Sequence, residues 1–210
     1  MMPQPRTLKI SEIFFSIQGE GLRQGEPTIF IRFAGCNLKC SFCDTKFAWQ
    51  GGRPYTAAQV VEKVRRLRDR FPARWVCLTG GEPLLQNLRQ LVRLLKKEKL
   101  KIQVETNAIY YKPLPFDWIT VSPKPRAYAF APEYRKLATE VKLVVTRDLR
   151  FKTIKRLRQA FPAKTPLLLQ PQSNLRWSRK LALKLLNESL AAGLENIRLS
   201  LQVHKILGLR

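Results

Sequence analysis

The stretch Thr28–Trp49, TIFIRFAGCNLKCSFCDTKFAW, places Cys36, Cys40 and Cys43 in a C-x3-C-x2-C array directly after a strand-like run. Three thiolates this close in sequence can converge on one inorganic centre, because a short loop closes around it at little entropic cost. The array supplies three ligands and leaves a fourth position open. In a [4Fe-4S] cluster, that open position leaves one iron able to bind a substrate or a cofactor. The spacing therefore suits a working cluster, although the three cysteines alone leave other uses open.

Two other uses of these cysteines are a zinc site and a disulfide. Zinc needs a fourth ligand, whereas the only histidine of the chain is His204 and Cys77 lies 34 residues beyond Cys43. A disulfide needs an oxidising compartment. The N-terminal sequence has neither a charged-then-apolar signal nor a small-residue cleavage site, so we expect a cytoplasmic protein with reduced cysteines. We interpret Cys77, in the middle of a predicted strand, as a buried apolar residue.

The length of 210 residues suits one domain, and no linker interrupts it, so a single domain over residues 1–210 is expected. No apolar run approaches the roughly 18 residues that span a bilayer. The net charge is +24, which raises the possibility of a nucleic-acid partner. The basic residues, however, alternate with Val and Leu at helical spacing, which favours solvated outer faces of amphipathic helices. They are Arg65, Arg66, Arg68, Arg70, Arg89, Arg93, Lys96, Lys97, Lys99, Lys101, Lys152, Lys155, Arg156 and Arg158.

Strand-like and helix-like segments alternate along the chain. The predicted strands are 8–17, 28–33, 75–79, 101–105, 118–121, 140–145 and 167–169, and the predicted helices are 57–71, 83–99, 148–161 and 177–192. Alternation of this kind predicts an α/β fold in which helices cover a parallel sheet, either open or curled into a barrel. Functional residues of such folds lie at the carboxyl ends of the strands.

Polar or glycine-rich residues follow each of these strand ends, as expected for an enzyme. An open iron suits a ligand with an amine and a carboxylate, such as the methionine end of S-adenosylmethionine. Gly80 and Gly81 allow the backbone to approach such a ligand, and Glu82 can receive its ammonium group. The other predicted cofactor-binding residues are Glu105, Asn107, Ser122, Lys124 and Gln170. Taken singly, Glu82 could instead stabilise the first turn of a helix and Lys124 could be an exposed loop lysine.

These motifs resemble the radical S-adenosylmethionine enzymes, which carry C-x3-C-x2-C with an aromatic residue, here Phe42, before the last cysteine and a GGEP motif, here Gly80–Pro83. Further segments resemble one family within that superfamily, 7-carboxy-7-deazaguanine synthase of queuosine and 7-deazapurine biosynthesis. The resemblance runs from about Leu8 to the last residue. Its segments are IQGEG (17–21), IRFAGCNLKCSFCDT (31–45), LTGGEP (78–83), VETN (104–107), VSPK (121–124) and HKILG (204–208).

The resemblance implies an incomplete, shortened (β/α) barrel that forms a homodimer. It also implies a carbon-nitrogen lyase that converts 6-carboxy-5,6,7,8-tetrahydropterin to 7-carboxy-7-deazaguanine with loss of ammonia. A reduced [4Fe-4S] cluster would cleave S-adenosylmethionine, and the resulting radical would take a hydrogen atom from the pterin C6. The electron would come from a donor such as flavodoxin or ferredoxin.

The resemblance also assigns roles to individual residues. Thr45 corresponds to a hydroxyl ligand of a Mg²⁺ ion, and Arg32 would pair with the pterin carboxylate. The other substrate contacts that it implies are Gln18, Glu20, Thr79, His204 and the C-terminal carboxylate of Arg210.

Two other functions fit parts of the sequence. A glycyl-radical activating enzyme uses the same cluster and GGEP motif but needs a long groove for a protein loop, whereas IQGEG and Arg32 suit a small charged heterocycle. An RNA-binding protein with a structural cluster would need a fourth ligand and aromatic residues on a basic sheet. The sequence offers neither, so no membrane or specific nucleic-acid partner is expected.

Overall fold

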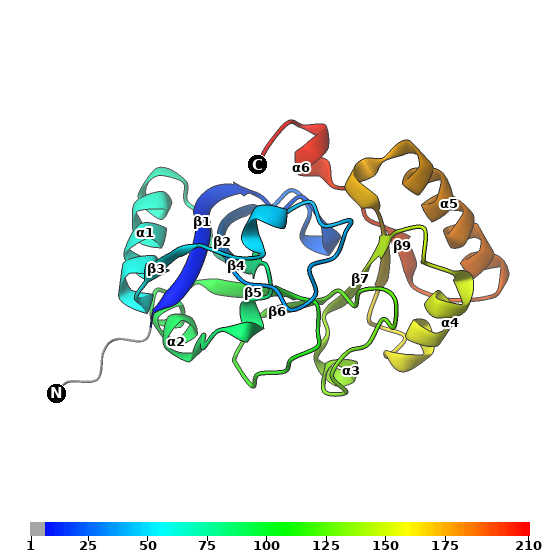
Figure 1. The fold of residues 1–210 in the computed structure, drawn as a ribbon, viewed down its shortest axis with the longest axis horizontal. Coiled ribbons are helices and arrows are strands. Elements are labelled where there is room, and N and C mark those ends of the chain that lie inside the picture. Colours follow the sequence, from blue (N-terminus) through cyan, green and yellow to red (C-terminus); the bar gives the residue numbers. More distant parts are fainter. Residues whose placement is uncertain (1–6) are drawn as a thin grey trace. The chain divides into compact units, whose positions relative to one another are not determined.

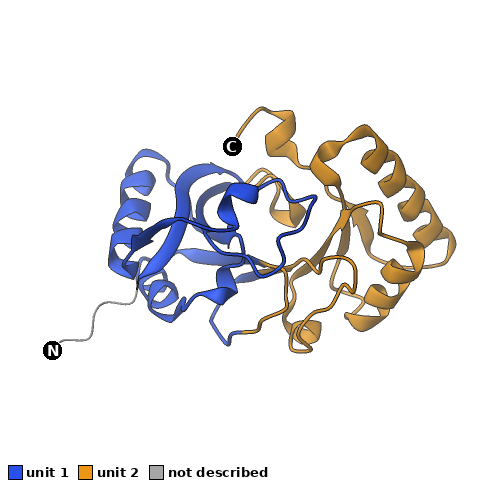
Figure 2. Ribbon diagram, viewed as in Figure 1, with its two compact units in different colours: residues 1–17, 27–105, 112–118 blue, residues 18–26, 106–111, 119–210 orange. Residues whose placement is uncertain are grey.

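The computed structural model describes residues 7–210, which form two compact units (Figures 1 and 2). Unit 1 comprises the described residues 7–17, 27–105 and 112–118, and unit 2 comprises 18–26, 106–111 and 119–210. Segments of the units alternate along the chain, so neither unit is a continuous stretch. Residues 1–6, which contribute to the export interpretation, lie outside the described residues. The single domain over residues 1–210 stays a prediction.

Unit 1 contains a sheet with the strand order β3-β1-β2-β4-β5. Its strands are β1 (Leu8–Ile17), β2 (Pro27–Phe33), β3 (Arg53–Tyr55), β4 (Trp75–Gly80) and β5 (Lys101–Thr106). β2, β4 and β5 run parallel, as expected, but β1 pairs antiparallel with both β2 and β3. The expectation of parallel pairing is therefore wrong at this edge. Pro54 fits there, because an edge strand does not need every backbone N–H for the sheet.

Two helices contact each other and cover part of unit 1: α1 (Ala57–Arg70) and α2 (Arg89–Lys97). Thr56 caps α1, because its side chain accepts from the Gln59 N–H while the Gln59 side chain accepts from the Thr56 N–H. Val60 and Val64 of α1 and Leu91 of α2 are buried. The apolar stripes read from the sequence therefore face the interior of unit 1.

The predicted helix 83–99 is wrong as a single element. It is divided into a 3-10 helix, η3 (Pro83–Leu85), and α2. Gln86 lies in extended backbone between them, and its side chain bonds to the backbone of distant residues. Its Nε2 donates to the carbonyl oxygens of Lys9 and Ala34, both at 2.9 Å, and its Oε1 accepts from the Lys9 N–H at 2.8 Å. These tertiary hydrogen bonds override the local helical preference.

Unit 2 contains a parallel sheet in the order β6-β7-β8-β9. Its strands are β6 (Trp118–Val121), which begins at the boundary with unit 1, β7 (Glu140–Val145), β8 (Leu167–Pro171) and β9 (Ile197–Leu199). Its α-helices are α3 (Tyr134–Leu137), α4 (Phe151–Ala160), α5 (Arg176–Ala191) and α6 (Val203–Ile206). α5 packs on β8 and β9 and contacts α4. The predicted βα alternation is therefore present in this unit.

The remaining short elements are three 3-10 helices, η1 (Gly21–Arg23), η2 (Lys46–Ala48) and η4 (Gln172–Asn174). None of them was expected from the sequence, because one turn is too short to show a periodic pattern. In the part of the chain that the structure describes, no helix is both long and apolar enough to cross a membrane.

One basic residue departs from the expectation of solvated helix faces. Arg158 of α4 is only 7 % exposed, and its guanidinium donates to the carbonyl oxygens of Thr165 at 2.6 Å and Phe161 at 3.1 Å. It also donates to the carbonyl oxygen of Pro162. Burial lowers the pKa of Arg158. Arg158 is therefore a buried cation that binds carbonyl groups at and after the C-terminus of α4, where a positive charge is favoured.

Candidate active site

The cysteine loop and the GGE segment of unit 1 are joined by backbone hydrogen bonds. The N–H of Gly81 donates to the carbonyl oxygen of Phe33 at 2.9 Å, and the N–H of Glu82 donates to that of Gly35 at 2.7 Å. The contact is close enough that a Cβ on Gly81 would lie 2.0 Å from the Gly35 oxygen and 2.8 Å from the Ala48 oxygen. A glycine is therefore required here, and the two predicted motifs form one structural element.

Cys36, Cys40 and Cys43 lie in this loop and are all partly exposed. A turn holds the last two, with the Cys43 N–H donating to the Cys40 carbonyl at 2.9 Å, and the Thr45 N–H approaches the Cys43 sulfur at 3.4 Å. Among residues 7–210, no group of three or more His, Cys, Asp or Glu side chains is already arranged to hold a metal ion. The donor chemistry fits an iron-sulfur cluster, because accessible thiols are the protein ligands of such clusters.

The other residues near this loop have defined places. Phe42 is half-buried, as is Thr45, whose hydroxyl donates to Asp44 Oδ1 at 3.0 Å. Cys77 is fully buried in a cluster with Phe14 and Phe30. The interpretation of Cys77 as a buried apolar residue is therefore confirmed.

A polar row crosses the sheet of unit 1 near the carboxyl ends of its parallel strands. Glu12 of β1 lies opposite Arg32 of β2, Arg32 is in register with Thr79 of β4, and Thr79 Oγ1 donates to Glu105 Oε2 of β5 at 3.1 Å. The structure thus brings together three residues that the sequence singled out, Arg32, Thr79 and Glu105. Glu12 was not predicted from the sequence, although a charge in the middle of an otherwise mostly apolar strand is a usable signal.

Arg32 makes an ion pair with Glu12, in which Nε donates to Glu12 Oε1 at 2.7 Å and both side chains are largely buried. Its guanidinium carbon lies 5.6 Å from the centre of the Phe14 ring and 6.0 Å from that of Phe47. Within residues 7–210, neither Nη group of Arg32 has a hydrogen-bond acceptor. Glu12 therefore binds the Nε side of the guanidinium. The two Nη groups at the other end form a fork that suits a carboxylate ligand.

Glu82 is the N-cap of η3 and is completely buried, and its Oε1 accepts from the Leu84 N–H at 3.0 Å. The structural role that the sequence left open for Glu82 is therefore present. Lys112 donates to the carbonyl oxygen of Gln86 at 2.7 Å. Burial lowers the pKa of Lys112, and the charge of Glu82 opposes this shift.

Unit 2 brings the IQGEG segment together with the C-terminal residues. The Val203 N–H donates to the carbonyl oxygen of Gly19 at 2.9 Å, and the Gly21 N–H donates to Ser200 Oγ at 2.9 Å. His204 lies directly over Gly19. Gln18 is buried in the same loop, and Arg210 is exposed at the end of the chain. Two predicted substrate-contact segments far apart in the sequence are therefore neighbours in this unit.

The Glu20 carboxylate binds side chains of Gln202 and Lys142 in unit 2. Its Oε1 accepts from Gln202 Nε2 at 2.6 Å, and its Oε2 forms an ion pair with Lys142 of β7. Neither Lys142 nor Gln202 was predicted from the sequence. A usable signal for Lys142 was its charge, because it lies in a strand whose other residues are almost all buried.

The predicted cofactor residues of unit 2 also have defined places. The Lys124 ammonium group donates to the carbonyl oxygen of Ser122 at 2.8 Å and also to the Ser122 hydroxyl. The Ser122 hydroxyl in turn donates to the carbonyl oxygen of Lys142 at 2.8 Å. Asn107 accepts from the Ile109 N–H at 3.1 Å within a turn. Gln170 of β8 is buried, and its Oε1 has no hydrogen-bond partner among the described residues. A ligand would satisfy this oxygen, because a buried acceptor rarely stays unpaired.

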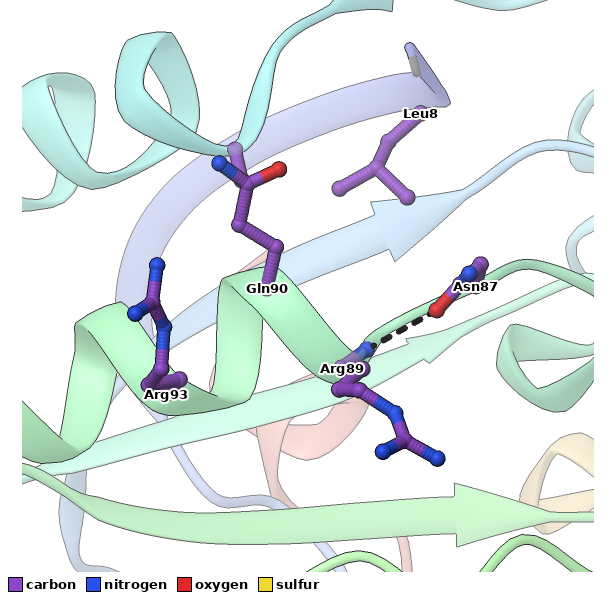
Figure 3. Close-up of a pocket in the computed structure, with 6 residues that line it drawn as sticks. Leu8, Asn87, Arg89, Gln90 and Arg93 are labelled. Carbon is purple, nitrogen blue, oxygen red and sulfur yellow. Dashed lines mark hydrogen bonds between the residues drawn. The ribbon is translucent and has the colours of Figure 1, made fainter. Parts of the chain in front are cut away.

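A surface pocket of about 480 Å³ lies elsewhere in unit 1, between the start of β1 and the first turns of α1 and α2 (Figure 3). Leu8, Ala57, Asn87, Arg89, Gln90 and Arg93 line it. None of the residues predicted from the motifs is among them. The pocket is therefore not part of the candidate site. The residues of that site lie at strand ends and are connected by hydrogen bonds.

Comparison with known proteins agrees with this geometry. Residues 30–177 match the Radical SAM superfamily. The chain is 36 % identical to the 7-carboxy-7-deazaguanine synthase of Synechocystis sp., over 96 % of this chain and 93 % of the relative. It is 37 % identical to that of Methanospirillum hungatei, over 98 % and 88 %. The crystal structure of QueE from Escherichia coli superposes with a TM-score of 0.77 at 28 % identity, covering 93 % of this chain and 94 % of that one.

The fold and the cysteine loop therefore define a radical S-adenosylmethionine protein, which confirms the predicted α/β fold class. Within that superfamily the chain belongs to the 7-carboxy-7-deazaguanine synthase family.

Proposed function

We propose that this protein is a 7-carboxy-7-deazaguanine synthase. It converts 6-carboxy-5,6,7,8-tetrahydropterin to 7-carboxy-7-deazaguanine with release of ammonia, as a carbon-nitrogen lyase of queuosine or 7-deazapurine biosynthesis. The observation that carries this proposal is the joined cysteine loop and GGE segment of unit 1, in a chain that matches synthases of this family over nearly its whole length.

In this proposal Cys36, Cys40 and Cys43 hold a [4Fe-4S] cluster. When bound, the cluster and S-adenosylmethionine would supply the radical chemistry at the pterin C6. The chain contributes binding and orientation. Backbone at Gly81 lies against the cysteine loop, and the orphaned Gln170 Oε1 offers an acceptor for the cofactor. The further cofactor contacts are Phe42, Gly80, Glu82, Glu105, Asn107, Ser122 and Lys124.

Charged side chains would hold the pterin. The free fork of Arg32 suits the pterin carboxylate, and Glu20 suits N–H donors of the ring. Gln18, Thr79, His204 and the carboxylate of Arg210 complete the proposed contacts. Thr45 would contribute its hydroxyl to a Mg²⁺ ion whose other ligands are substrate oxygens and water.

The proposal extends to the cellular setting. The protein would act in the cytoplasm as a homodimer and receive electrons from a flavodoxin or a ferredoxin. The exposed basic residues of α1 and α2 give this chain a positively charged surface, which would suit a donor with an acidic surface.

The proposal is tested by anaerobic incubation of the reconstituted protein with reductant, S-adenosylmethionine, Mg²⁺ and 6-carboxytetrahydropterin. Mass spectrometry then measures 7-carboxy-7-deazaguanine and 5'-deoxyadenosine, and a parallel reaction omits Mg²⁺. We expect product with little net consumption of S-adenosylmethionine and slower turnover without Mg²⁺. Cleavage of S-adenosylmethionine without product would mean that the enzyme acts on another substrate. No cleavage by protein with a loaded, reduced cluster would refute the proposal that this protein is a radical enzyme.

A further inference from the structure

Two side chains that lie far from Glu20 in the sequence of unit 2 hold its carboxylate. Lys142 Nζ donates to Oε2, and Gln202 Nε2 donates to Oε1 at 2.6 Å. The Lys142 side chain is only 6 % exposed and that of Glu20 is 15 % exposed, so the ion pair lies largely out of water. The carboxylate therefore has a fixed orientation and a matched positive charge.

β7 holds the same loop at a second point. Glu140 and Lys142 are two residues apart on this strand, so their side chains share one face of the sheet. Glu140 Oε2 accepts from the Leu22 N–H at 2.8 Å, and its Oε1 accepts from Thr120 Oγ1 at 2.8 Å. Lys142 therefore binds the side chain of the loop while Glu140 binds its backbone.

The loop is shaped to permit this double contact. Gly21 has a φ of +72°, which disfavours other residues, and a Cβ on it would lie 2.4 Å from Glu140 Oε1. The tail adds the bond from Gly21 to Ser200 Oγ. The loop is thus clamped on the side of β7 and on the side of the C-terminal residues.

The energetics of such a pair favour a role in orientation. The attraction within a buried ion pair does little more than offset the free-energy cost of desolvating its two charges. Apolar residues at these positions would therefore stabilise the fold about as well. What apolar residues could not supply is an ionised carboxylate held in one position. A carboxylate offers about four acceptor sites, so the bonds from Lys142 and Gln202 do not by themselves use all the acceptor sites of Glu20.

We infer that Lys142 is a positioning residue for substrate recognition, which holds Glu20 ionised and aimed at N–H donors of the pterin. The inference rests on the proposed function. Removal of the positive charge leaves Glu20 to take up a proton or turn away, and in either case an acceptor for the substrate is lost. Lys142 does not touch the substrate and acts through Glu20.

The test compares Lys142→Met, Lys142→Arg, Glu20→Gln and the double variant Lys142→Met/Glu20→Gln with the wild-type protein, all with reconstituted cluster. Lys184→Met is the matched control, because Lys184 of α5 is 71 % exposed in the same unit. The measurements are KM and kcat for the pterin, and 5'-deoxyadenosine formation without pterin. Equilibrium binding of 6-carboxypterin, a stable oxidised analogue, is measured in parallel.

We expect Lys142→Met to raise KM and weaken analogue binding by about 10- to 100-fold, the loss expected for a charge-assisted contact. Cofactor cleavage without pterin should stay within about twofold of the wild type, since the cofactor contacts are unchanged. Lys142→Arg should recover most of the loss. The double variant should be no worse than Glu20→Gln alone, because both changes remove the same acceptor.

Unchanged KM in Lys142→Met, or losses that multiply in the double variant, would overturn the inference. Should Lys142→Met fail to fold because Glu20 is left without a counter-charge, the double variant and Lys142→Arg still decide between these outcomes. A wild-type protein that neither turns over the pterin nor binds its analogue would refute the proposed function itself. A wild-type protein that turns over the pterin, together with Lys142 variants of normal KM, would instead refute only the role of Lys142.

Discussion

The imidazole of His204 occupies the space that any side chain at Gly19 would need, since a Cβ there would lie 2.0 Å from Nδ1. The IQGEG loop and the C-terminal residues are therefore fitted to each other. We expect Gly19→Ala to displace His204 and to raise the KM for the pterin by tenfold or more, because a shift of about 1 Å in a positioning group can cost about 100-fold in rate.

The double variant Gly19→Ala/His204→Ala separates the steric effect from the functional one. It should recover the thermal stability lost in Gly19→Ala, because the clash is removed, but it should not recover turnover. Steady-state kinetics and thermal unfolding measure the two effects. Normal kinetics in Gly19→Ala would contradict the proposed place of His204 in the site.

Gly81→Ala tests the junction between the cysteine loop and the GGE segment. The new methyl group would collide with the carbonyl oxygens of Gly35 and Ala48, so the loop must move, at a cost of about 1–3 kcal/mol. We expect lower iron and sulfide content after reconstitution and slower 5'-deoxyadenosine formation. Gly51→Asn is the control, because no atom lies within 4 Å of a Cβ there and Asn tolerates the φ of +78°. Full cluster content in Gly81→Ala would count against the junction.

Cys36→Ala, Cys40→Ala and Cys43→Ala should each abolish the [4Fe-4S] absorbance and the iron content, because two thiolates cannot hold the cluster. Cys77→Ala should retain both and lose only roughly 1 kcal/mol of stability, since it removes one sulfur from the packed contact with Phe14 and Phe30. A stable, active cluster in any of the first three variants would refute the ligand assignment.

Arg32→Lys should raise the KM for the pterin by about 10- to 100-fold while 5'-deoxyadenosine is still formed without substrate. Lysine keeps the charge but not the fork that Glu12 leaves available, so bidentate binding of a carboxylate is lost. Arg66→Lys is the control, because the Arg66 side chain is 77 % exposed on α1. Equal KM values for both variants would remove Arg32 from the substrate site.

Arg158→Ala should lower the free energy of unfolding by about 2–4 kcal/mol, because it leaves three carbonyl groups without their charged donor. Lys155→Ala, an exposed position on the same helix, should change it by less than about 0.5 kcal/mol. Chemical denaturation measures both. A small loss in Arg158→Ala would mean that this arginine is as dispensable as the solvated ones around it.

The sequence by itself determined much of the local structure. β1, β6 and β7 were predicted with the bounds that the structure gives, and the Thr56–Gln59 capping box of α1 lies within four consecutive residues. The cysteine array and the GGEP motif identified the superfamily. These features depend on residues close together in the chain, such as alternation along a strand, spacing of ligands in one loop, or a side chain three residues from the group it caps.

Only the tertiary structure decided which distant residues meet. Gln86 ends η3 because it bonds to the backbone of Lys9 and Ala34, and Arg158 is buried because carbonyl groups beyond its own helix receive it. Lys142 gave no motif, and it becomes interpretable only through its ion pair with Glu20, 122 residues earlier. The physical reason is the same in each case. Burial and hydrogen-bond partners supplied by other segments outweigh local propensities of a few tenths of a kcal/mol.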